Sequence, residues 1–161
     1  MSVTLKNMQD ETVELEVKYA MQSGAIRAAT NDGDTLDEEV PVDASMPTLQ
    51  KCIEFMKYYD ETPMGDIAKP LRSDSMAELV GEWYANFIDV PQELLFDLSI
   101  TSNRLMIRPL FDLASAKIAS QLKNMDVEQM RKYFHTTGDF TPEEEEIIKK
   151  ENLTAASAFW F

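Results

Sequence analysis

The sequence predicts a mixed α/β fold of the α+β kind, in which a small N-terminal sheet is followed by helices. Three observations lead to this prediction. Apolar and polar residues alternate with a period of two only near the start of the chain. From about residue 83 onward, apolar residues recur at helical spacings of three and four. The 161 residues are also about the length of one domain, since single cores typically span roughly 100–200 residues.

The N-terminal strands follow from the alternation. Val3 and Leu5 alternate with polar neighbours, and the run TVELEV places Val13, Leu15 and Val17 on one face of a strand. Two such runs on either side of the polar stretch NMQDE predict a β-hairpin. The later stretch EVPVD predicts one more short strand.

Short helices and loops are expected between these strands and the middle of the chain. The alternation is lost after the hairpin, where we expect short helical pieces interrupted at Gly24. Residues 31–39 are acidic and rich in turn formers, which predicts a loop. An amphipathic helix should start near Ser45, with four apolar residues on one face: Leu49, Cys52, Ile53 and Met56.

No apolar period is visible from residue 60 to residue 76, where Pro63, Gly65 and Pro70 are found, and a long mobile loop is expected there.

The second half of the chain is predicted to be helical throughout. Its apolar stripes are expected in the core, and they comprise Leu94, Leu95, Leu98, Ile107, Leu110, Phe111, Ala114, Ile118 and Leu122.

Two helix starts near the C-terminus carry clear capping signals. Asp126 and Gln129 have the spacing of a capping pair, and the helix that they begin is expected to end near His135. In DFTPEEEE, Thr141 is the expected N-cap, Pro142 the first helical residue and Glu144 the reciprocal partner. The acidic side chains that follow favour the positive end of the helix dipole.

The charge balance excludes several partners. A formal charge of −14 and an isoelectric point near 4.4 disfavour nucleic acid and anionic membranes, both of which are bound chiefly through clusters of Lys and Arg. No apolar run approaches the roughly 20 residues that span a bilayer, and the N-terminus lacks the pattern of a signal peptide. We therefore expect a cytoplasmic and nuclear protein. The single cysteine, Cys52, is expected to be a buried thiol.

Motifs for chemistry are missing from the sequence, which has five glycines and no phosphate-binding loop, GxSxG, HExxH, CxxC or EF-hand pattern. His135 is the single histidine, and its place at a helix end favours a solvated role. The four carboxylates from Glu143 to Glu146 point around the helix axis and do not converge. We expect no enzyme, no cofactor and no metal; an acidic enzyme would need turnover that depends on His135 or on a carboxylate pair.

The C-terminus is unusually apolar. No charged residue follows Glu151, and the chain ends in Ala-Phe-Trp-Phe. Three aromatic side chains would bury on the order of 150–250 Å² each, so they should have a partner. That partner is either the chain's own core or another protein, and the few large apolar residues of the preceding helix favour another protein.

The stretch MRKYFHTTGDFTPEEEEIIKKEN resembles the C-terminal signature of the Skp1 family, the adaptors of cullin-RING ubiquitin ligases. Upstream, WYANFIDVPQELLFDLSITSNRLMIRPLFDLASAKIASQL is similar to the helices that precede it in that family, and the N-terminal strands resemble its opening. The resemblance implies a BTB/POZ-type core over residues 1–125, with mobile loops near 31–39 and 60–76. It also implies a helical extension over residues 126–161 that binds F-box proteins.

The resemblance further implies the adaptor role in an SCF ubiquitin ligase, where one surface binds F-box substrate receptors and another binds a cullin. Carried over by position, the F-box contacts are Phe96, Met130, Phe134, Phe140, Ile147, Ile148, Asn152 and Trp160. The cullin contacts are Asn103, Arg104 and Ile107, within Asn-Arg-Leu-Met-Ile-Arg-Pro, where the family usually has Asn-Tyr-Leu-Asp-Ile-Lys-Gly.

Arg104 is the reason for an alternative to the adaptor role, because a charge replaces an aromatic ring at the expected cullin contact. The change favours either a cullin that has become acidic or a scaffold that binds F-box proteins outside cullin complexes, for example at a kinetochore. The resemblance also implies a weak homodimer when no F-box partner is bound. Pro142 aligns with a proline that is hydroxylated and glycosylated in some protist members of the family, so it is a candidate modification site.

Overall fold

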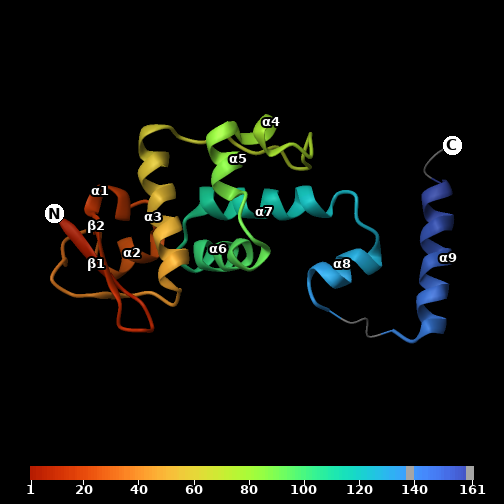
Figure 1. Cartoon of the computed structure of the whole chain (residues 1–161), viewed down its shortest axis with the longest axis horizontal. Coiled ribbons are helices and arrows are strands. Elements are labelled where there is room, and N and C mark those ends of the chain that lie inside the picture. The colour runs from red at the N-terminus through yellow and green to blue at the C-terminus, as the bar shows by residue number, and fades with distance from the viewer. Residues whose placement is uncertain (137–139, 159–161) are drawn as a thin grey trace. The chain divides into compact units, whose positions relative to one another are not determined.

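A computed structural model describes residues 1–136 and 140–158 of the chain (Figure 1). The chain divides into two compact units, Met1–Lys123 and Asn124–Phe161, which are called the core unit and the terminal unit below. The core unit holds every buried apolar residue among the described ones, from Val3 to Ala116. Each unit is described by itself.

A three-stranded sheet opens the core unit. Strands β1 (Ser2–Lys6) and β2 (Thr12–Glu16) form the predicted antiparallel hairpin, and β3 (Val40–Pro41) pairs in parallel with β1, so that the order is β2-β1-β3. The side-chain oxygen of Asn7 accepts hydrogen bonds from the backbone N–H groups of Gln9 and Glu11, which closes the hairpin turn. The strands predicted from the apolar alternation are therefore confirmed, and their burial alternates along the chain.

Seven helices in the core unit follow or interrupt these strands among the described residues. They are α1 (Val17–Ala20), α2 (Gly24–Ala29), α3 (Met46–Glu61), α4 (Met76–Val80), α5 (Glu82–Ile88), α6 (Gln92–Arg104) and α7 (Arg108–Leu122). The predicted helix start near Ser45 is confirmed. The predicted interruption of the short helices lies just before Gly24, which is the first residue of α2. Val17, which was predicted to extend the second strand, instead begins α1.

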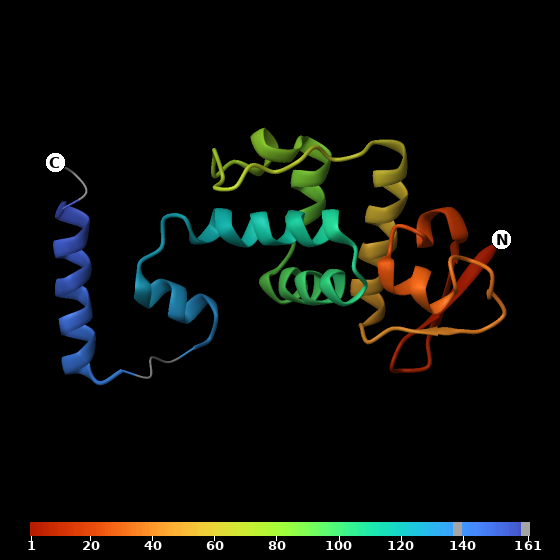
Figure 2. The ribbon, with the colours of Figure 1, turned by 180° about the vertical axis from the view of Figure 1, so that it is seen from behind.

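Helix α3 lies between the sheet side of the core unit and the group of α5, α6 and α7, as both views show (Figures 1 and 2). Its fully buried Phe55 contacts the rings of Tyr59, Tyr84 and Phe87 at centroid distances of 5.5–5.8 Å. Cys52 is also fully buried, as predicted, and burial raises the pKa of its thiol to about 12. The aromatic cluster therefore joins α3 to α5.

The start of α2 is held against the end of α6. Ser23 caps α2 by accepting a hydrogen bond from the N–H of Ile26, and its hydroxyl donates to the Leu105 carbonyl. The N–H groups of Gly24 and Ala25 donate to the Met106 and Leu105 carbonyls at 3.3 and 3.2 Å. The free N–H groups of one helix start thus pair with the carbonyls just after another helix end.

Residues 62–75 form no helix or strand, as predicted. Met64, Ile67 and Leu71 nevertheless pack against the core, which the sequence pattern did not indicate. The mobility expected for this loop stays a prediction.

The terminal unit contains α8 (Val127–Tyr133) and α9 (Pro142–Ala158). Both predicted capping boxes are confirmed, at Asp126 with Gln129 and at Thr141 with Glu144. The two helices are joined by an ion pair between Arg131 Nη2 and Glu145 Oε1 at 2.7 Å. Gly138 lies outside the described residues. No helix in the described parts of either unit is both long and apolar enough to cross a bilayer.

Candidate protein-binding surfaces

The terminal unit exposes an unusual amount of apolar surface. None of its side chains is buried within residues 124–136 and 140–154. Its large apolar side chains are between 42% and 72% exposed at five positions, here called the terminal apolar surface: Val127, Phe134, Phe140, Ile147 and Leu153. Exposed apolar groups in such number favour a binding surface over a self-contained fold.

The predicted F-box contacts are distributed over both units. Phe134, Phe140 and Ile147 belong to the terminal apolar surface. Beside them in the terminal unit, Met130 and Ile148 are half-buried and Asn152 is exposed. Phe96 lies half-buried on α6 of the core unit, and Trp160 lies outside the described residues.

Two members of the terminal apolar surface, Val127 and Leu153, were not among the predicted contacts. Val127 follows the N-cap Asp126, and its helical spacing from Met130 and Phe134 on one face of α8 is the signal that could have found it. Leu153, which is 72% exposed, lies in the charge-free stretch after Glu151, and that apolar stretch is the signal that could have found it. Tyr133 is half-buried on α8, and burial raises the pKa of its hydroxyl.

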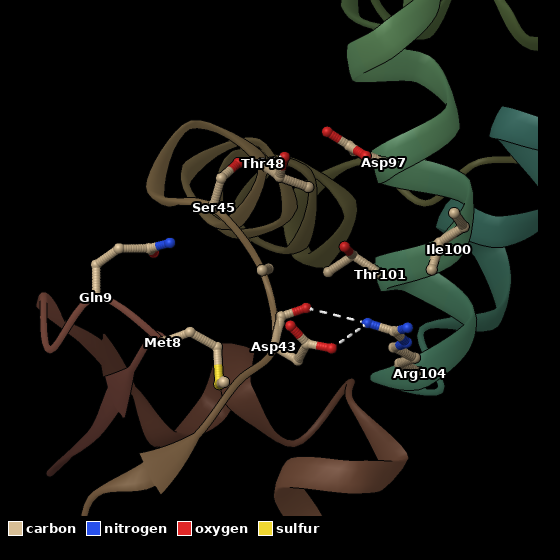
Figure 3. Close-up of a pocket in the computed structure, with 10 residues that line it drawn as sticks. Met8, Gln9, Asp43, Ser45, Thr48, Asp97, Ile100, Thr101 and Arg104 are labelled. Carbon is tan, nitrogen blue, oxygen red and sulfur yellow. Dashed lines mark hydrogen bonds and ion pairs between the residues drawn. The ribbon is translucent and has the colours of Figure 1, made fainter.

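A second candidate surface surrounds a pocket of about 320 Å³ in the core unit, here called the α3–α6 pocket (Figure 3). It lies between the hairpin turn, the segment after β3, the start of α3 and one face of α6. Its lining residues are Met8, Gln9, Asp43, Ala44, Ser45, Thr48, Asp97, Ile100, Thr101 and Arg104.

Arg104, one of the predicted cullin contacts, lies on the rim of this pocket and forms an ion pair with Asp43. One nitrogen of its guanidinium contacts both the carboxylate and, at 3.5 Å, the backbone carbonyl of Asp43. The two side chains remain 56% and 65% exposed. The positive charge expected at the cullin contact is therefore already paired within the chain.

The other two predicted cullin contacts differ in their burial. Asn103 is exposed beside Arg104. Ile107 is fully buried in the core, so its side chain offers no surface to a partner, and the prediction of direct contact through it is corrected. Ile107 is the N-cap residue of α7, and its side chain packs in the core at the turn between α6 and α7.

Exposed apolar side chains flank the α3–α6 pocket as well. Met8 on the hairpin turn is 73% exposed and Ile100 on α6 is 51% exposed. Thr48 and Thr101 are buried in the pocket wall, and Ser45 shares a hydrogen bond of 2.9 Å with Thr48. The pocket thus has a buried polar wall and an exposed apolar rim.

Other residues singled out in the sequence show no catalytic arrangement. His135 is exposed just after α8 and has a positive φ of 53°. No group of three or more possible metal ligands is found within the part of the chain that the structure describes. Pro142 is exposed at the first position of α9, where its missing N–H would be unpaired in any case.

The chain is similar to known proteins over nearly its whole length. Residues 108–155 match the sequence profile described as "Skp1 family, dimerisation domain". The chain is 34% identical over 158 residues to the S-phase kinase-associated protein 1 homolog of Tetrahymena thermophila, covering 97% of this chain and 95% of that protein. It is 30% identical to the E3 ubiquitin ligase complex SCF subunit sconC of Arthroderma otae (93% and 92% covered). It is 29% identical to the SCF ubiquitin ligase complex protein SKP1a of Dictyostelium discoideum (93% of each covered).

Proposed function

The chain belongs to the Skp1 family, and on that premise we propose that it is a non-enzymatic adaptor of an SCF ubiquitin ligase that bridges F-box substrate receptors to a cullin. One relative is named as a subunit and another as a protein of an SCF ubiquitin ligase complex, which supports the adaptor role. One observation carries the F-box half of the proposal: the terminal apolar surface belongs to a unit without a buried side chain among its described residues.

The terminal apolar surface is suited to an F-box protein because its partner can supply the core that the terminal unit lacks. Fully burying one Leu, Ile or Phe side chain contributes about 1.5–3 kcal/mol. Leu153 and Ile147, which are 72% and 57% exposed, are therefore the residues from which binding should gain most. When no F-box protein is present, the same surface of a second copy can cover it, which would give the weak homodimer.

The α3–α6 pocket supports the cullin half of the proposal. It lies in the core unit, whereas the terminal apolar surface lies in the terminal unit, so that two partners can bind at different places. Ile100 and Met8 supply apolar contacts there, and Asn103 and Arg104 follow Ile100 on the same helix.

A ternary binding experiment tests this bridging. The purified chain, an F-box peptide and a cullin N-terminal domain should form a complex of one copy each in analytical ultracentrifugation. Ile147→Glu should abolish F-box binding and leave cullin binding intact, because it places a charge in the terminal apolar surface. Ile100→Glu should do the reverse, so that each variant is the matched control for the other.

Failure of cullin binding by the wild-type chain, with F-box binding retained, would contradict the bridging role. The alternative, a scaffold for F-box proteins outside cullin complexes, is favoured by one observation, the arginine at position 104. If Arg104→Tyr restored cullin binding to a wild-type chain that lacked it, the alternative would replace the adaptor role.

A further inference from the structure

The charges around the α3–α6 pocket indicate which chemistry its partner carries. The pocket is lined by the carboxylates of Asp43 and Asp97 and by the guanidinium of Arg104 as its charged groups. Arg104 is paired with Asp43, so these two charges largely cancel. The net negative charge of the pocket therefore rests with Asp97.

Asp97 is available to a partner. It is exposed on α6, and its carboxylate has no hydrogen-bond or ion-pair partner within residues 1–136 and 140–158. Figure 3 shows Asp97 pointing from α6 toward the start of α3, across the pocket from Ser45 and Thr48. The neighbouring Ile100 gives the pocket an apolar edge next to this carboxylate.

We propose that the α3–α6 pocket receives a Lys or Arg side chain of the cullin, carried on an apolar segment, with Asp97 as the acceptor and Arg104 as an internal counter-ion that weakens the attraction. A long basic side chain fits such a place because its stem can lie along Ile100 and Met8 while its head reaches Asp97. This inference rests on the proposed cullin binding and names the chemistry of that contact.

A basic partner is the opposite of the acidic partner that the charge of Arg104 alone would favour. An unpaired arginine in place of a tyrosine favours an acidic partner. Because Asp43 already engages Arg104, an acidic partner would have to compete with Asp43 and would approach Asp97 at the same time. The overall charge of −14 adds to the repulsion and attracts a basic partner at low salt.

Affinities for a cullin N-terminal domain, measured by titration calorimetry at low and high salt, test the proposal. Asp97→Lys should weaken binding about tenfold or more at low salt, because like charges would then face each other. Arg104→Ala should tighten binding severalfold, because it frees Asp43 for the partner. Asp66→Lys is the matched control, since Asp66 is exposed outside the pocket and undergoes the same charge change.

Unchanged circular dichroism and thermal unfolding show that each variant of the core unit is folded, and F-box affinity should be retained because the terminal apolar surface lies in the other unit. The proposal is overturned, and the adaptor role kept, if Asp97→Lys binds the cullin domain as the wild type does or if Arg104→Ala weakens binding. If the wild-type chain does not bind the cullin domain at all, both the bridging role and this inference are wrong.

Discussion

Ile107 is fully buried three residues after the exposed Arg104, at the residue that caps α7. Its side chain fills the core where α6 ends and α7 begins. A substitution there should affect the exposed residues beside it only through the position of the turn. A residue that a family resemblance marks as an interface residue can thus be a core residue in this chain.

Ile107→Ala should lower the free energy of unfolding by about 2–5 kcal/mol, since it leaves a cavity in a packed core. Asn103→Ala, its exposed neighbour and control, should change the free energy of unfolding by less than about 0.5 kcal/mol. Urea denaturation followed by circular dichroism measures both. Equal stability of the two variants would show that Ile107 does not act through the core.

The thiol of Cys52 should be unreactive in the folded protein. Its pKa is raised to about 12 by burial, so at about pH 8 the fraction of reactive thiolate is small, and the side chain is also inaccessible. Iodoacetamide should label Cys52 in denaturant and not in native buffer, as mass spectrometry can determine. If raising the pH to a value below about 10 were enough to label Cys52 in the folded protein, the raised pKa would be contradicted.

At the scale of residues, the sequence predicted burial well where periodicity is strong. Cys52 lies within the apolar stripe of α3, and it is buried. The pairing of Arg104 with Asp43 could not be predicted, because 61 positions separate the two residues and no local pattern links them.

At the scale of elements, the junction between α2 and the end of α6 depends on the absence of a side chain at residue 24. A Cβ on Gly24 would lie 3.0 Å from the Cβ of Met106, which is closer than two such atoms can comfortably approach. Met106 itself has a positive φ of 55°, a conformation that glycine adopts more easily.

Gly24→Ala should therefore destabilise the chain by about 1–3 kcal/mol, although alanine has the higher helix propensity. In a Met106→Gly background, the same change should cost little, because the clashing atom is gone. Thermal unfolding of the four proteins of this double-mutant cycle measures the coupling between the two sites. Additive effects would mean that the close approach does not limit the junction.

Element boundaries were predictable where local rules decide them. Both capping boxes of the terminal unit form as their spacing predicted, because each involves residues three positions apart. The end of the second strand was not predictable, since Val17 continues the alternation but starts α1. The packing of Met64, Ile67 and Leu71 was missed because residues 60–76 lack a period from which burial can be inferred.

At the scale of the whole molecule, the division into two units follows from where the buried residues lie. All of the buried apolar residues that the structure describes belong to the core unit. The extension that begins at residue 126 was predicted from the family resemblance. Composition alone would not have located the boundary between the two units.

A fragment that ends at Lys123 should fold and melt within a few degrees of the full chain, because it keeps the whole described core. It should bind a cullin N-terminal domain and lose binding to F-box proteins. Differential scanning calorimetry and pull-down measurements check the two parts. An unfolded fragment would show that the terminal unit contributes to the core, contrary to this prediction.

The lack of a buried side chain among the described residues of the terminal unit has a further consequence for how it recognises a partner. A helix as short as α8, with seven residues, is marginal in water without tertiary packing. Part of the ordering of the unit should then accompany association. The heat capacity of complex formation should be more negative than a rigid interface of the same area would give, as in folding coupled to binding. Recognition and completion of the fold would then be one thermodynamic event.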